Sequence, residues 1–482
     1  MNNPKQFDPS QHIEITDITE NTRGLLSRIE SFFVRQKDRL IWVHAMMFVV
    51  FVALIFLPLF LSEPSEQAGP LDHFTEFANY AMWGLWFPLV LLSVVFTGRS
   101  WCGLLCPMGA ASEWANKNGP QFAIPRWLKW QGTPIVSFIL VTTLGQTVGV
   151  RDHPEAIALV FGGTLGMAIL IGFFFGRNKR AWCRHACPIG LLLGVFSRVG
   201  AIQFTPKRPK PGCEGYTEKG ICPTMIDITR KQESRHCIEC FRCVNPKAKG
   251  GLALRARRPG LEIENIHDHN PNSAEVWFLF LGIGSALGGF LWLVLDLYQQ
   301  WRLGVAGWFI DHELWWIGDA GPWWLMSVHP ERREVFTWLD FIMIVGFMSL
   351  CAITLAAILW SMTALGAKLS DALSQSDHYP PLTLKQRMIE QGYQYAPVAL
   401  ISLVLGLGAE LFEPLRLIGL NSTGISWAKG TLFVMSLLWS VFLGNKILAR
   451  QGVAAYQRWL PLVPGIAGSS VIATLWWLAL FN

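Results

Sequence analysis

The chain has 482 residues, of which 51% are hydrophobic and only 15% are charged. A soluble domain typically carries about 25% charged residues, so this composition excludes an ordinary soluble protein and indicates a polytopic membrane protein. The net charge of +6 does not indicate nucleic-acid binding, because the basic residues follow a membrane-topology pattern. The expected partner of most of the surface is therefore the lipid bilayer, and no nucleic-acid partner is expected.

Nine apolar segments reach the roughly 18–25 residues needed to cross a bilayer. They cover residues 40–61, 78–97, 134–150, 156–176, 275–297, 338–361, 395–413, 428–447 and 462–480. The segment 134–150 is the shortest, and two glycines weaken it. We therefore expect an all-α polytopic membrane protein with about nine transmembrane helices.

The basic residues lie almost entirely on one side of the predicted membrane. If the N-terminus is cytoplasmic, 34 of the 40 lysines and arginines lie on the cytoplasmic side. This asymmetry follows the positive-inside rule. It predicts that nine of the ten cysteines lie at or beyond the cytoplasmic face.

Composition divides the chain into four parts. They are a polar cytoplasmic N-terminal segment (1–39), a four-helix membrane domain (40–200), a small cytoplasmic domain without a spanning run (201–270) and a five-helix membrane domain (271–482). The four-helix domain contains an internal repeat, because Trp-Cys-x3-Cys-Pro-x-Gly occurs twice, at 101–109 and 182–190. Each copy follows a helix that runs toward the cytoplasm.

The small cytoplasmic domain carries a ligand pattern for a metal cluster. Cys237, Cys240 and Cys243 form a C-x2-C-x2-C triplet, and Cys222 precedes a proline upstream. A triplet with a separate Cys-Pro is typical of one cubane cluster, so we expect a ferredoxin-like domain with a [4Fe–4S] cluster on these four cysteines. Four cysteines also suit zinc, but a zinc ribbon would use two C-x2-C pairs.

The same domain contains the remains of a second motif. Cys213 is what is left of its triplet, and Lys247 stands where the fourth cysteine of the intact motif would be. The domain therefore keeps ligands for one complete cluster. Cys213 is ambiguous: it is a vestige, a spare ligand, a partner in a second site or a residue without a metal role.

The two repeated pairs, Cys102 with Cys106 and Cys183 with Cys187, predict a further site. Four-residue spacing on one helix would put both thiols of a pair on the same face, about 5–6 Å apart at Cβ. If the repeat forms a pseudo-two-fold pair, all four thiols converge just under the membrane. A second cluster, a Cu(I) site or a reversible dithiol would suit them, and two structural cysteine pairs are the alternative.

Paired Cys-x3-Cys-Pro motifs at the ends of transmembrane helices, followed by a ferredoxin-like domain, resemble the NapH- and NosR-type membrane polyferredoxins. The wider group includes the FixG/CcoG oxidase-assembly proteins. The resemblance covers residues 40–260. It implies a multi-pass protein of the bacterial inner (plasma) membrane that carries electrons through iron–sulfur clusters. Its electrons would pass between a quinone or cytoplasmic reductant and a respiratory redox partner protein, so it is not a stand-alone enzyme.

The chain departs from these families in two ways. NapH-like proteins carry two complete ferredoxin clusters, whereas this chain keeps ligands for one in its small domain. FixG/CcoG proteins end in a periplasmic domain, whereas this chain has five more predicted helices. The FixG/CcoG resemblance keeps an alternative function open, in which the chain is a copper-handling assembly factor for a respiratory metalloenzyme. A transporter would leave the clustered cysteines unexplained.

Overall fold

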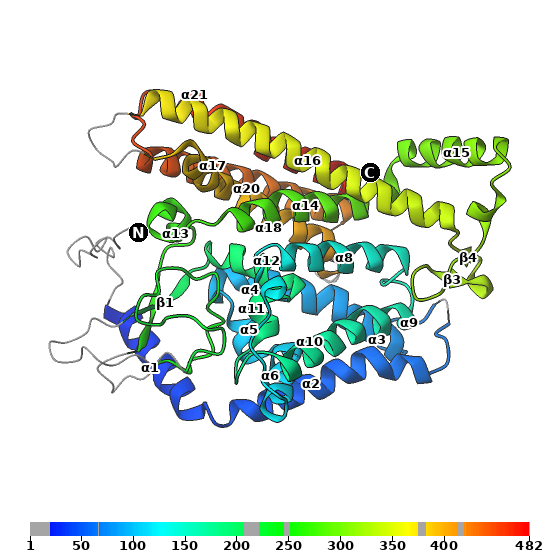
Figure 1. The fold of residues 1–482 in the computed structure, drawn as a ribbon, viewed down its shortest axis with the longest axis horizontal. Coiled ribbons are helices and arrows are strands. Elements are labelled where there is room, and N and C mark those ends of the chain that lie inside the picture. Colours follow the sequence, from blue (N-terminus) through cyan, green and yellow to red (C-terminus); the bar gives the residue numbers. More distant parts are fainter. Residues whose placement is uncertain are drawn as a thin grey trace.

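The computed structural model describes residues 20–65, 67–206, 221–244, 251–374, 382–412, 419 and 421–481. Cys213 and Lys247 lie outside these residues. The described part of the chain is mostly helical, and its long helices run side by side along one common direction (Figure 1).

Seven of the predicted spans are helices that are long and apolar enough to cross a membrane. They are Leu40–Phe60 (containing α2, Leu40–Phe56), Phe74–Thr97 (α3, Phe74–Asn79, and α4, Phe87–Thr97), Pro154–Phe174 (α9, Pro154–Ile157, and α10, Gly163–Phe174), α14 (Ser273–Val294), α16 (Trp338–Leu373), α20 (Ser422–Arg450) and α21 (Trp459–Phe481). The chain is thus a multi-pass membrane protein.

The other two predicted spans form shorter apolar helices inside the same bundle. They are α8 (Thr133–Thr147), which packs against α14 and α16, and α18 (Ala396–Leu407), which packs against α20 and α21. A helix of 15 residues is about 22 Å long, less than the roughly 30 Å hydrocarbon core. A count of nine spans therefore stays a prediction.

The two sequence repeats interlock. After α4 the first copy forms α5 (Ser100–Leu104) and α6 (Pro107–Asn118), and after α10 the second forms α11 (Ala181–His185) and α12 (Pro188–Ser197). The last helix of each copy packs against the spanning helix of the other, α6 on α10 and α12 on α4. Equivalent backbone hydrogen bonds close both contacts, from Phe122 N–H to the Phe174 carbonyl (2.7 Å) and from Ala201 N–H to the Val95 carbonyl (2.8 Å).

The small domain is closed by a two-stranded antiparallel sheet of β1 (Ile202–Pro206) and β2 (Leu252–Ala256). Helix α1 (Glu20–Gln36) covers it, because Phe33 stacks on Phe241 and the Glu30 carboxylate accepts a hydrogen bond from the Leu254 N–H. A buried ion-pair network joins the domain to the bundle. Arg198, beside α12, pairs with Glu262 (2.8 Å) and with Glu275 of α14 (2.9 Å).

The remaining elements lie near the ends of the bundle. Figure 1 shows α1, β1, α13 (Leu261–Glu264) and α17 (Leu384–Gly392) at one end, and α15 (Asp296–Asp311), β3 (Val328–His329) and β4 (Glu334–Val335) at the other. The short α7 (Arg126–Lys129) precedes α8. Helices α1 and α13 and strand β1, at the first end, belong to segments predicted to be cytoplasmic. At the other end, β3 and β4 belong to residues 298–337, which separate two predicted spans.

Candidate metal centres

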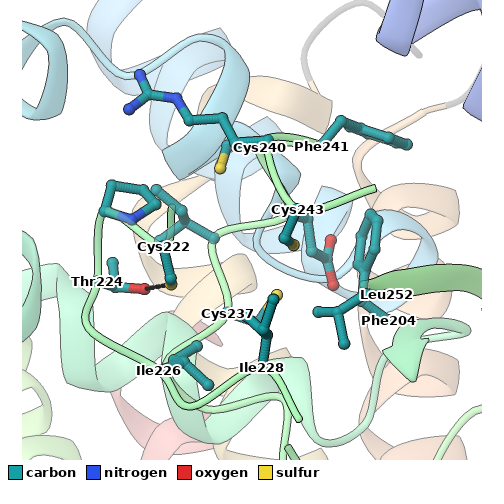
Figure 2. Close-up of a pocket in the computed structure, with 14 residues that line it drawn as sticks. Phe204, Cys222, Thr224, Ile226, Ile228, Cys237, Cys240, Phe241, Cys243 and Leu252 are labelled. Carbon is teal, nitrogen blue, oxygen red and sulfur yellow. Dashed lines mark hydrogen bonds between the residues drawn. The ribbon is translucent and has the colours of Figure 1, made fainter. Parts of the chain in front are cut away.

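The four cysteines predicted to bind a cluster in the small domain converge on one pocket, which we call the loop site. Figure 2 shows the sulfur atoms of Cys222, Cys237, Cys240 and Cys243 turned toward a common space. Apolar side chains that include Phe204 complete its wall, and the empty volume is about 360 Å³. Among the described residues, no three His, Cys, Asp or Glu side chains are placed to chelate a single metal ion. The four sulfurs surround a space, as the ligands of a cluster do.

The backbone of the loop site is strained in a way that suits an anion. Met225, Glu239 and Phe241 have φ values of 60°, 52° and 58°, although none of them is glycine. A left-handed conformation costs an L-residue roughly 1–2 kcal/mol. Alternation of right- and left-handed residues aims successive N–H groups into one concavity, an arrangement found at many iron–sulfur sites. The strain thus points to a bound anionic group.

The four cysteines of the repeated motifs form a second group, which we call the repeat site. Cys106 is the N-cap of α6 and Cys187 is the N-cap of α12, each followed by proline at the first helical position. The positive end of a helix dipole favours a thiolate at such a position. The expectation that both thiols of a pair share one continuous helix face is wrong, because each pair spans a break between a short helix and a longer one.

A glycine lets the two copies of the motif approach each other. A Cβ atom added at Gly109 of the first copy would lie 3.2 Å from Cys183 Sγ of the second and 3.7 Å from the Cys102 carbonyl oxygen. That distance to sulfur is tighter than ordinary van der Waals contact, so a side chain here would push the copies apart. The repeat thus places Cys183 of the second copy against Gly109 of the first, and the convergence of all four thiols stays a prediction.

Two buried arginines lie at the repeat site, and sequence reasoning missed them. Arg99 and Arg180 stand three residues before Cys102 and Cys183, and both are at most 2% exposed. Each has one N–H group without a hydrogen-bond partner, at Nε and at Nη2 respectively. A buried unpaired donor is costly, so an anionic acceptor between these arginines fits the site. The signal in the sequence is Arg-x-Trp-Cys, present in both copies.

The repeat site and the loop site are in direct contact. A Cβ atom at Gly103 would lie 2.9 Å from Cys240 Cα and would also overlap the Ile238 carbonyl oxygen. The backbone N–H of Arg180 donates a hydrogen bond of 2.8 Å to the carbonyl oxygen of Pro223, which follows Cys222. The backbone of one cysteine motif therefore packs against the backbone of the other.

A carboxylate joins the cations of both sites. Glu113 of α6 pairs with Arg180 of the repeat site at 2.8 Å and with Arg242 of the loop site at 2.7 Å. Although burial opposes its ionisation, the two guanidinium groups lower the pKa of Glu113 to about 2. The carboxylate thus stays charged and bridges the sites.

Burial raises the pKa of thiols at both sites. Burial raises the pKa of Cys237 to about 12, and burial with the charges of Cys102 and Cys183 raises that of Cys106 to about 12. Metal binding must therefore release protons, and the positive surroundings must offset the charge of the thiolates. The orphaned arginine donors and the strained loop meet that requirement.

The repeated motifs match a known family model. A family model described as "4Fe-4S binding domain" matches residues 81–130 and 159–208. The first match contains Cys102 and Cys106, and the second contains Cys183 and Cys187. No solved structure matches the chain.

Several curated proteins match about a third of the chain. An uncharacterized protein of Methanocaldococcus jannaschii is 26% identical over 177 residues, covering 35% of this chain and 69% of the relative. The ferredoxin-type protein NapH of Haemophilus influenzae is 26% identical over 180 residues (33% and 62%). The regulatory protein NosR of Pseudomonas aeruginosa is 24% identical over 223 residues (37% and 31%). The predicted resemblance is therefore confirmed: this chain is similar to the NapH- and NosR-type ferredoxin-like membrane proteins, and a 4Fe-4S binding domain model matches it twice.

Proposed function

We propose that this protein transfers electrons across two adjacent [4Fe–4S] clusters in the bacterial inner membrane. Cys222, Cys237, Cys240 and Cys243 would hold one cluster at the loop site, and Cys102, Cys106, Cys183 and Cys187 would hold the other at the repeat site. The observation that carries the proposal is the grouping of eight cysteines into two sets of four whose backbones touch at Gly103 and Cys240.

Bound clusters would supply reversible one-electron carriers. The residues of the chain set the conditions for that chemistry. Arg99 and Arg180, which are both buried, offset negative charge at the repeat site. At the loop site the backbone N–H groups of Glu239 and Arg242 donate hydrogen bonds to the thiols of Cys237 and Cys240. Hydrogen bonds and charges near the sulfurs set the reduction potential.

The direct contact between the sites supports an electron path from one to the other. Its external ends would be a quinone or cytoplasmic reductant and a respiratory redox partner. The printed names of relatives such as the ferredoxin-type protein NapH support an electron-transfer function. On this proposal the chain works as a relay within a larger system.

Anaerobic purification followed by reduction tests this function. The full chain in lipid vesicles is mixed in turn with a quinol and with a low-potential soluble reductant, and the EPR spectrum is recorded. We expect at least one donor to produce the signal of a reduced iron–sulfur cluster, and we expect that signal to disappear on addition of an oxidised acceptor. Fully metallated protein that neither donor reduces would contradict the proposal, and stoichiometric copper would support the copper-handling alternative.

The proposed orientation has its own test. We place the loop site in the cytoplasm, because 34 of the 40 basic residues then follow the positive-inside rule. Reporter fusions after Arg258 and within residues 298–337 should give opposite readouts. The same readout at both positions would overturn this topology.

A further inference from the structure

A second pocket lies on the flank of the repeat site. Its wall includes Cys183 and Cys187 of the second motif copy, Trp130 and Pro134 near the start of α8, and Ala274 at the start of α14. Its empty volume is about 680 Å³. Trp130 is 61% exposed, so the pocket can be reached from the surface.

Apart from the thiols of Cys183 and Cys187, the titratable side chains in the wall of this pocket are basic. It contains four cationic side chains and two histidines, namely Arg99, Lys129, Arg184, Arg235, His185 and His236. Two carboxylates outside the wall form ion pairs with Arg235. They are Glu233, at 3.6 Å from Arg235 Nη2, and Glu275, at 3.5 Å from Arg235 Nε. No carboxylate of the described chain lies within ion-pair distance of the other three cations. Among the described residues, Lys129 and Arg184 of this wall therefore have no carboxylate partner.

Two further features point to an anionic ligand. The pocket is bordered by the N-terminal ends of α8, with 15 residues, and α14, with 22, whose dipoles favour a negative charge there. Arg99, which is 2% exposed and lines the pocket, keeps its Nε–H without a hydrogen-bond partner. An oxyanion in the pocket would suit both the two helix ends and the cations that lack a carboxylate partner.

The position of the pocket restricts the kind of anion. Lys129 and the exposed Trp130 lie just before α8, and an exposed tryptophan beside a lysine is typical of a membrane–water interface. Basic pockets between membrane helices commonly take the phosphate groups of anionic lipids. Guanidinium groups such as those of Arg99 and Arg184 suit phosphate, because they donate two parallel hydrogen bonds.

We propose that this pocket binds a phosphate-bearing anion beside the Cys183–Cys187 pair, either the head group of an anionic phospholipid or free phosphate. The ligand would place its negative charge among Arg99, Lys129 and Arg184. The pocket shares Cys183 and Cys187 with the repeat site, but binding of the anion requires neither an electron donor nor an electron acceptor.

Lipid retention and phosphate titration test the proposal and distinguish a phospholipid head group from free phosphate as the bound anion. The anaerobically purified full chain is incubated with equal amounts of phosphatidylglycerol and phosphatidylcholine, and bound lipid is counted by native mass spectrometry. Inorganic phosphate is titrated separately by calorimetry. Selective retention of phosphatidylglycerol assigns the site to a lipid, whereas phosphate binding without lipid selection assigns it to free phosphate.

Variants locate the site. We expect Lys129→Gln to weaken binding of the anion about fivefold and Lys129→Gln with Arg184→Gln to weaken it about 30-fold, at about 1 kcal/mol per cation. Arg126→Gln is the matched control, because it removes an exposed charge from the same short helix α7 without lining the pocket. Arg184 lies between Cys183 and Cys187, so its replacement could disturb metal binding, and iron content is measured on each variant. If the double variant loses iron, the Lys129→Gln variant alone decides the result.

Two outcomes would overturn the proposal. The first is a wild-type chain that binds neither phosphatidylglycerol in preference to phosphatidylcholine nor inorganic phosphate. The second is a Lys129→Gln variant that binds the anion as tightly as the Arg126→Gln control.

Discussion

At the repeat site the thiols lie at or just before two helix starts related by duplication, whereas at the loop site they come from one stretch of irregular backbone. Cys106 and Cys187 are fixed by the first turns of α6 and α12. Cys237 and Cys240 instead lie in a loop that passes through left-handed residues. Helix packing therefore positions thiols of the first site, whereas irregular backbone positions those of the second.

The charged side chains around the two sites also differ. Buried arginines at equivalent positions of both copies face the repeat site, and each lacks one hydrogen-bond partner. At the loop site Arg242 is 36% exposed, and the buried Lys231 lies near the thiol of Cys237. Paired arginines from the two copies thus face the repeat site, whereas a lysine and a partly exposed arginine face the loop site.

The largest effect should come from removing ligands of the repeat site. We expect Cys102→Ser to cost nearly as much electron transfer as replacement of Cys102, Cys106, Cys183 and Cys187 together, because the remaining thiols of a shared cluster are under-coordinated. Such strong non-additivity is typical of residues that act as one unit. Transfer rates between a chemical reductant and an acceptor measure it. Additive losses from the two pairs would instead indicate two separate dithiols.

Metal removal should affect hydrogen exchange differently at the two sites. Chelation under oxidising conditions should raise hydrogen exchange in residues 221–244 by tenfold or more, because about 1.4 kcal/mol of lost protection gives that factor. Exchange in α6 and α12 should change little, since these helices are packed on α10 and α4. Hydrogen exchange followed by mass spectrometry provides the measurement. Equal deprotection of both regions would remove the structural distinction between the sites.

Glu113→Gln should destabilise the protein by about 3–5 kcal/mol, because it leaves the fully buried Arg180 without its counter-ion. The control is Glu63→Gln, whose exposed ion pair with Arg332 should contribute at most about 1 kcal/mol. Chemical denaturation in detergent, followed by tryptophan fluorescence, compares the variants. A loss at Glu113 no larger than that at Glu63 would show that the carboxylate does not hold the sites together.

The smallest effect should come from Gly103→Ala, which tests the contact between the sites. The added methyl group would overlap the backbone at Ile238 and Cys240, so we expect a cost of about 1–3 kcal/mol and slower electron exchange between the clusters. Gly166→Ala in α10 is the matched control, because nothing lies within 4 Å of its Cβ position. Freeze-quench EPR follows the exchange rate. Equal rates in both variants would exclude an electron path through this contact.

The sequence predicted the spans and the grouping of the cysteines, because hydropathy and ligand spacing are local properties. It also carried a signal for the broken helices, since Pro107 and Pro188 favour the first helical position, but the four-residue spacing was interpreted as one continuous face. The burial of Arg99 and Arg180 and the contact of Gly103 with Cys240 depend on how the small domain folds back on the bundle. No local pattern encodes that long-range packing.

The most direct test of two clusters is the iron and acid-labile sulfide content of the anaerobically purified chain. We expect about eight iron atoms and eight sulfides per chain. We expect about four of each when either the loop-site or the repeat-site cysteines are all replaced by serine. About four irons in the wild type, with none lost when the repeat-site cysteines are replaced, would contradict the account.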